Sequence, residues 1–182
     1  MGHYYELHVA GITRQLKKIR ISDELTIASF VMLGDTELIE RTGEELFRRL
    51  PEGIEMLVCP EAKGIPLTHV IASKLGIDYV IIRKSVKGYM EEPLVQKVQS
   101  ITTREPQIIV LDGLDAEKLK GKKVCIIDDV VSTGGSLKAV EDLLEKADCN
   151  VIAKAAVLLE EGGYCGEDLI YLEKLPVFRN SE

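Results

Sequence analysis

The sequence contains no apolar run of the length that a membrane-spanning helix requires, about 20 residues. Its first residues, from Met1 to Glu6, do not place cationic residues before an apolar stretch, so we expect no secretory signal. Glu6 also stands where an N-myristoylation signal has Ser or Thr. A basic excess is missing too, because the 182 residues carry a net charge of −7. We therefore expect a cytoplasmic protein that binds neither membranes nor nucleic acids.

Residues with the spacing of metal ligands are also absent. The four cysteines are far apart and form no CxxC pair: Cys59, Cys125, Cys149 and Cys165. Two of them, Cys59 and Cys125, lie within apolar runs, so free thiols are expected rather than disulfide bonds or a zinc site. The three histidines show no such spacing either: His3, His8 and His69. The sequence therefore predicts no site in which protein side chains alone hold a metal ion.

The length of the chain suits one compact domain. Short runs rich in Val and Ile alternate with helical patterns: 56–59, 79–82, 108–111, 124–127 and 151–159. Such runs are typical of central strands covered on both faces. Asp35 is expected to cap one helix, and Pro66 and Gly76 to bracket another. We predict an α/β fold with a mainly parallel, twisted sheet, helices on both faces, and ligands at the carboxyl ends of strands.

Two segments do not follow this alternation. Residues 1–34 are expected to form a helix and short strands beside a core that comprises residues 35–182. Residues 85–106 are polar and too long for an ordinary connection. Long loops in compact domains are often lids over a functional site, so we predict a mobile loop there.

The most informative motif is VCIIDDVVSTGGS, residues 124–136. An apolar strand is expected to end at two carboxylates, Asp128 and Asp129. Small, apolar or hydroxylated residues then lead into a helix: Val130, Val131, Ser132, Thr133, Gly134, Gly135 and Ser136. Free backbone N–H groups at a helix start, with glycines and hydroxyls around them, bind phosphate. The carboxylates would repel that phosphate and are expected to face ribose hydroxyls, which indicates a ribose 5-phosphate. A plain helix cap with a glycine turn is the alternative, but the whole arrangement favours a ligand.

Competing motifs are not present. The sequence has neither GxxxxGK[ST] nor GxGxxG, which excludes the common nucleotide-binding loops. Ser132 has no His or Lys arranged beside it in the sequence, so a serine hydrolase is not expected.

Residues 124–136 resemble the phosphoribosyl pyrophosphate signature of type I phosphoribosyltransferases, and the resemblance extends over roughly residues 33–178. It is nearest to the adenine phosphoribosyltransferase branch, with some features of xanthine enzymes and of purine regulators. The resemblance implies transfer of the 5-phosphoribosyl group from phosphoribosyl pyrophosphate to a purine base, adenine being favoured. It also implies Mg²⁺ held mainly by the substrate, a homodimer, and an N-terminal hood over the base.

The same resemblance assigns roles to particular residues. Catalytic roles fall to Asp128, Asp129, Lys84 and Glu105, and residues 130–136 receive the 5-phosphate. Residues in two segments would bind pyrophosphate: Glu61, Ala62, Lys63, Gly64, Arg83, Lys84 and Lys87. The family often has Arg where Lys63 stands, and it often has one cis peptide in this loop. Val130 and Glu160 would contact the base.

Departures from the family pattern leave the base open. The adenine enzymes carry Ser-Tyr and Glu in the mobile loop, whereas residues 98–105 read VQSITTRE, with Glu105 as a substitute. Hypoxanthine, guanine or xanthine is therefore an alternative base. A regulator that binds phosphoribosyl pyrophosphate without turnover is a second hypothesis, although no helix-turn-helix extension is evident. A doubly wound methyltransferase is a remoter third.

Overall fold

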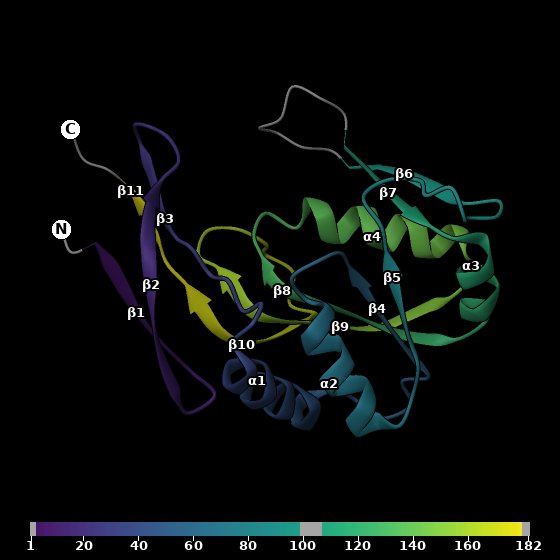
Figure 1. The fold of residues 1–182 in the computed structure, drawn as a ribbon, viewed down its shortest axis with the longest axis horizontal. Coiled ribbons are helices and arrows are strands. Elements are labelled where there is room, and N and C mark those ends of the chain that lie inside the picture. The colour runs from purple at the N-terminus through teal and green to yellow at the C-terminus, as the bar shows by residue number, and fades with distance from the viewer. Residues whose placement is uncertain (1–2, 99–106, 180–182) are drawn as a thin grey trace.

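The computed structural model describes residues 3–98 and 107–179. A parallel five-stranded sheet lies at its centre, in the order β10-β9-β8-β4-β5. Its strands are β4 (Met56–Pro60), β5 (Tyr79–Ile82), β8 (Lys123–Val131), β9 (Asn150–Glu160) and β10 (Leu169–Leu175). The helices are α1 (Thr36–Arg49), α2 (Ile65–Leu75), α3 (Gly113–Leu119) and α4 (Gly135–Lys146). Figure 1 shows α1 and α2 on one face and α4 on the other, which confirms the predicted α/β fold.

The helix boundaries follow the predicted signals. The Asp35 carboxylate caps α1 by accepting a hydrogen bond from the Leu38 N–H at 3.0 Å. Pro66 lies in the first turn of α2, and Gly76 ends that helix with a left-handed φ of 67°. None of the helices in the described residues is both long and apolar enough to cross a membrane.

One predicted central strand belongs elsewhere. The run at 108–111 forms β7 (Gln107–Leu111), which pairs antiparallel with β6 (Leu94–Val98) in a separate two-stranded sheet. Ile109 and Leu111 are buried in the apolar layer around α4, so the apolar run reflects burial there and not pairing in the parallel sheet. β6 lies inside the segment predicted to be a loop, and β10 takes the sheet edge that the sequence left unassigned.

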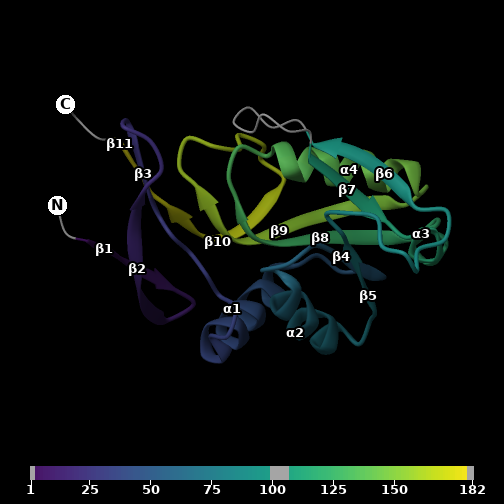
Figure 2. The same ribbon diagram turned by 45° about the horizontal axis from the view of Figure 1, so that its top comes forward.

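Within the described part of the N-terminal segment, residues 3–34, there are strands and no helix, which corrects the prediction of a helix there. β1 (Tyr4–Val9), β2 (Ile12–Arg20) and β3 (Leu25–Ala28) form an antiparallel sheet with β11 (Val177–Arg179) near the other end of the chain. Along β2, exposed and less exposed side chains alternate with the period of two that a strand requires. Figure 2 shows this sheet at the β10 end of the central sheet.

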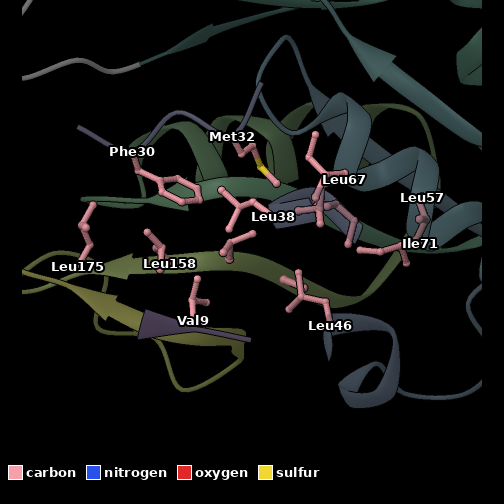
Figure 3. Close-up of a cluster of buried hydrophobic side chains, with 14 of the residues drawn as sticks. Val9, Phe30, Met32, Leu38, Leu46, Leu57, Leu67, Ile71, Leu158 and Leu175 are labelled. Carbon is pink, nitrogen blue, oxygen red and sulfur yellow. The ribbon is translucent and has the colours of Figure 1, made fainter. Parts of the chain in front are cut away.

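Two apolar cores fill the space on either side of the central sheet. The first lies between the sheet, α1, α2 and the N-terminal strands, and Figure 3 shows Leu38, Leu46, Leu57 and Leu158 among its side chains. The second lies between the sheet, α4 and the β6–β7 pair. The sheet is therefore buried on both faces, so polar groups gather at the carboxyl ends of its strands.

Candidate functional site

The paired carboxylates lie within β8 and not after it. β8 continues to Val131 because β9 also extends and pairs with it, Val130 opposite Leu158 and Val131 opposite Leu159. The sequence prediction placed the end of the strand at the two carboxylates, and the strand runs two residues beyond Asp129. Asp128 is half-buried and Asp129 is 8% exposed. Although successive side chains of a strand start on opposite faces, both carboxylates line the same cleft and lie close enough to interact with each other.

The two carboxylates are partly buried and lie beside each other. Burial, together with the neighbouring Asp129 carboxylate, raises the pKa of Asp128 well above its usual range. The Asp129 N–H donates to Asp128 Oδ1 at 2.8 Å. Asp129 Oδ2 is buried and accepts no hydrogen bond from the described residues, and the Lys63 Nζ lies 3.8 Å away. A buried acceptor without a donor is costly, so this atom fits a hydroxyl or a cation brought by a ligand.

A small cavity follows the carboxylates along the chain. Residues 128 and 130–137 line a volume of about 120 Å³ at the start of α4. Gly134 precedes the helix with a φ of 85°, a conformation that glycine adopts without strain. The Ser132 Oγ donates to Glu160 Oε1 at 3.0 Å, so this serine is oriented by the end of β9. The cavity combines hydroxyls with free N–H groups of a helix start and is suited to one phosphate.

A second loop, residues 61–64, lies between β4 and α2. Its Glu61–Ala62 peptide bond is cis, as the resemblance led us to expect. A Cβ on Gly64 would lie 3.3 Å from Asp128 Cα and 3.4 Å from Asp129 N, so this loop packs directly against the carboxylate pair. The Glu61 carboxylate accepts a hydrogen bond from the Lys84 N–H at 2.6 Å and forms an ion pair with Arg83 at 3.0 Å. Glu61 therefore anchors the loop to the end of β5.

The larger cleft brings many of the predicted residues together. A cavity of about 700 Å³ is lined by Glu61, Ala62, Lys63, Lys84, Asp128, Asp129 and Ser136, and by apolar residues of β7 and α4. Arg83 and Lys87 do not line it, and the Lys87 Nζ donates instead to Ser85 Oγ at 2.6 Å. Glu160 lines neither cavity and contacts the site through Ser132. Glu105 lies outside the described residues.

Two residues that the sequence interpretation missed contribute to the site from behind. The Tyr164 N–H donates to the backbone carbonyl oxygen of Ser132 at 2.7 Å, and the Lys154 Nζ donates to the Tyr164 hydroxyl at 3.2 Å. The one signal for them was a lysine inside an apolar strand pattern. Among residues 3–98 and 107–179, no group of three or more His, Cys, Asp or Glu side chains is placed to hold a metal ion.

The fold and these loops define an α/β protein with a cleft of about 700 Å³ at the carboxyl ends of its parallel strands. Residues 33–175 match the phosphoribosyl transferase domain model, and the chain belongs to this family. The methyltransferase alternative is thereby removed.

Curated relatives agree with this membership. A hypoxanthine/guanine phosphoribosyltransferase of Methanothermobacter thermautotrophicus is 36% identical over 66% of this chain and 59% of its own length. A protein of the same name from Methanococcus voltae is 32% identical over 85% of this chain and 82% of its own. The chain thus spans less than two thirds of the first of these relatives.

Solved structures share the fold. An adenine phosphoribosyltransferase of Thermoanaerobacter pseudethanolicus matches with a TM-score of 0.66 at 24% identity, covering 79% of this chain and 84% of the other. One from Rhodothermus marinus gives a TM-score of 0.67 at 22% identity over 95% of this chain and 94% of the other.

Proposed function

We propose that this protein transfers the 5-phosphoribosyl group from phosphoribosyl pyrophosphate to a purine base and releases pyrophosphate. One observation carries the proposal: the carboxylate pair of β8 lies between two backbone cradles, residues 61–64 and residues 132–136. Phosphoribosyl pyrophosphate has the matching order of groups, with a pyrophosphate at one end, a diol in the middle and a phosphate at the other end.

In this proposal the protein mainly stabilises the pyrophosphate leaving group. Cleavage of the anomeric C–O bond builds negative charge on pyrophosphate, and cations and N–H donors there stabilise it. Lys63 and Lys84 line the cleft and supply positive charge, and the loop backbone supplies donors. Arg83 has its guanidinium engaged with Glu61, so its contribution is to orient this loop.

The carboxylates have a second role. Asp128 and Asp129 accept hydrogen bonds from the ribose hydroxyls, which fixes the sugar between the two cradles. Negative charge on the pair, whose Asp128 holds its proton more tightly than a free carboxyl because its pKa is raised, also favours the positive charge that develops on the ribose ring as the bond breaks. Asp129 Oδ2 accepts no hydrogen bond from the described residues and lies 3.8 Å from Lys63 Nζ, so it is the acceptor that the free protein has ready for this purpose.

The residues present also fit Mg²⁺. Because few carboxylates converge here, the ion would be held mainly by pyrophosphate and ribose oxygens, with Asp129 Oδ2 as the nearby protein acceptor. When bound, it would neutralise charge on the leaving group.

Two observations bear on the identity of the base, and they favour different bases. The motif resemblance favours adenine, whereas the relatives above 30% identity are named hypoxanthine/guanine phosphoribosyltransferases. Val130 and Glu160 are proposed to lie on the base side, with the N-terminal sheet as a hood and a homodimer as the assembly.

The test is to mix the protein with Mg²⁺, phosphoribosyl pyrophosphate and one base at a time: adenine, hypoxanthine, guanine or xanthine. Pyrophosphate release with one base would establish the activity and the substrate together. A D129N variant should release much less, whereas an E55A variant, altered at the opposite end of the sheet, should match the wild type. Binding of phosphoribosyl pyrophosphate without release for any base would overturn the proposal and favour a regulator.

A further inference from the structure

A buried lysine in β9 joins three elements behind the phosphate cavity. The Lys154 side chain is only 7% exposed, in a strand that is otherwise apolar around it. Its Nζ lies 2.7 Å from Glu141 Oε1 on α4 and 2.5 Å from Asp168 Oδ2, just before β10. Burial alone would lower the pKa of this lysine, but hydrogen bonds with Asp168, Glu141 and Tyr164 outweigh burial and raise it. The ammonium therefore stays charged and holds both carboxylates in place.

The lysine also fixes the hydroxyl of Tyr164. The Tyr164 oxygen accepts a hydrogen bond from Lys154 Nζ at 3.2 Å and donates to Asp168 Oδ1 at 2.7 Å. Nζ lies 5.6 Å from the centre of the same ring. Since the hydroxyl uses its donor and an acceptor site at once, the direction of the ring is determined by this cluster.

The ring of Tyr164 rests on the loop that precedes α4. A Cβ on Gly134 would lie 2.4 Å from Tyr164 Cδ2, closer than side chains approach one another. A Cβ on Gly163 would lie 2.3 Å from the backbone carbonyl oxygen of Ser132. The same oxygen accepts a hydrogen bond from the Tyr164 N–H at 2.7 Å. The segment after β9 and the phosphate loop thus touch through backbone and ring with no side chain between them.

We infer that Lys154 and Tyr164 are positioning residues that hold residues 132–134 in the shape that binds the 5-phosphate. The inference rests on the proposed function. Lys154 fixes the Tyr164 hydroxyl, the Tyr164 ring and N–H support the loop, and the loop presents the N–H groups at the start of α4. The Glu141 contact of the same ammonium anchors α4 itself.

The proposed substrate offers a sharp test, because its two anionic ends can be supplied separately. Ribose 5-phosphate probes the supported loop, and pyrophosphate probes residues 61–64 across the cleft. In K154M and Y164A we expect ribose 5-phosphate affinity to fall about 10- to 100-fold, as small displacements of binding groups do. Pyrophosphate affinity should stay at the wild-type value, and K154R, which keeps the cation, should recover part of the loss.

Titration calorimetry of each variant with each probe, in Mg²⁺, gives these affinities directly. A K74M variant is the control, because Lys74 also forms an ion pair between two elements, with Glu44 between α2 and α1, and lines neither cavity of the site. It should bind both probes as the wild type does. Y164A keeps the test decisive if K154M does not fold, since Tyr164 is half-buried in a loop.

The outcomes separate the two proposals. A wild-type protein that binds neither probe would remove the proposed function and this inference with it. A wild type that binds both, with variants that bind ribose 5-phosphate equally tightly, would overturn the inference alone. Equal losses for both probes would also overturn it, because they would indicate general destabilisation and not support of one loop.

Discussion

The Glu61 carboxylate accepts a hydrogen bond from the backbone N–H of Lys84 at 2.6 Å and so ties the loop after β4 to the end of β5. At the opposite end of the sheet, Glu55 makes the same kind of contact with the Lys123 N–H at 2.8 Å. The two glutamates differ in what they hold: Glu61 orients a loop of the cleft, whereas Glu55 joins the starts of two strands.

We expect E61A to weaken pyrophosphate binding about 10-fold, since a hydrogen bond to a charged group contributes about 1.5–3 kcal/mol. Calorimetry with Mg²⁺ and pyrophosphate measures the change. E55A removes an equivalent carboxylate far from the cleft and should bind pyrophosphate normally. Equal affinities in E61A and wild type would mean that the loop holds its shape without this contact.

The carboxylate pair predicts an unusual pH dependence of stability. Because the pKa of Asp128 is raised by burial and by Asp129, the folded state binds a proton more tightly than the unfolded state. The free energy of unfolding should then fall as pH rises from the ordinary carboxyl value of about 4 through the raised pKa of Asp128. D128N, which lacks this titration, should be more stable than the wild type at neutral and higher pH.

Thermal unfolding with EDTA, at about pH 5 and about pH 8, tests this dependence. The advantage of D128N should be larger at the higher pH and amount to at least about 1 kcal/mol, or about 2–4 °C for a domain of this size. Its pyrophosphate release should fall about 100-fold. An advantage that is equal at both pH values would contradict the raised pKa.

Arg14 connects the N-terminal sheet to the core. Its Nε lies 2.6 Å from Asp35 Oδ2, and its Nη2 lies 2.8 Å from Glu37 Oε2 at the start of α1. In R14M we expect faster amide exchange across β1 and β2. If this sheet is the proposed hood, the KM for the base should rise about 3- to 10-fold while that for phosphoribosyl pyrophosphate stays constant.

Hydrogen exchange by mass spectrometry, followed by steady-state kinetics, measures both effects. R20M is the control, because Arg20 lies on the same strand but pairs with Asp23 of the adjoining turn. If R14M raised the KM for phosphoribosyl pyrophosphate by a larger factor than the KM for the base, the hood would be refuted.

Gly43 predicts a packing conflict between α1 and α2. A Cβ there would lie 2.7 Å from Val70 Cγ1, and a valine side chain has little freedom to move away. Alanine adds about 1 kcal/mol of helix propensity, but overpacking costs about 1–3 kcal/mol, so G43A should be destabilised. In urea denaturation, G43A/V70A should lose less free energy of unfolding than the losses of G43A and V70A added together. Additive effects would show that the helices separate without cost.

Much of the fold was predictable because buried strands appear in the sequence as apolar runs. Four of the five apolar runs became parallel strands, and the helix signals at Asp35 and Gly76 were confirmed. The run at 108–111 was assigned to the wrong sheet because apolarity does not identify a strand's partner. β10 was missed because it is an edge strand with exposed Glu173 and Lys174, which dilute the apolar pattern.

The site residues, too, fall into those that the sequence predicted and those that it did not. Its backbone cradles are contiguous in sequence, so the glycines and hydroxyls of residues 132–136 could be read from one motif. Tyr164 contacts that motif only because the segment after β9 turns back toward Ser132. Such a contact depends on tertiary structure, and the sequence showed only a lysine in an apolar strand.

The pairing of β3 with β11 has a consequence for the order of folding. Val177 lies opposite Ile27, so the N-terminal sheet cannot gain its fourth strand on the ribosome until nearly the whole core has been synthesised. Until β11 is synthesised, β3 has one edge without a partner strand, and contacts this distant in sequence form slowly. Nascent chains are therefore expected to be vulnerable to edge-to-edge association until β11 emerges.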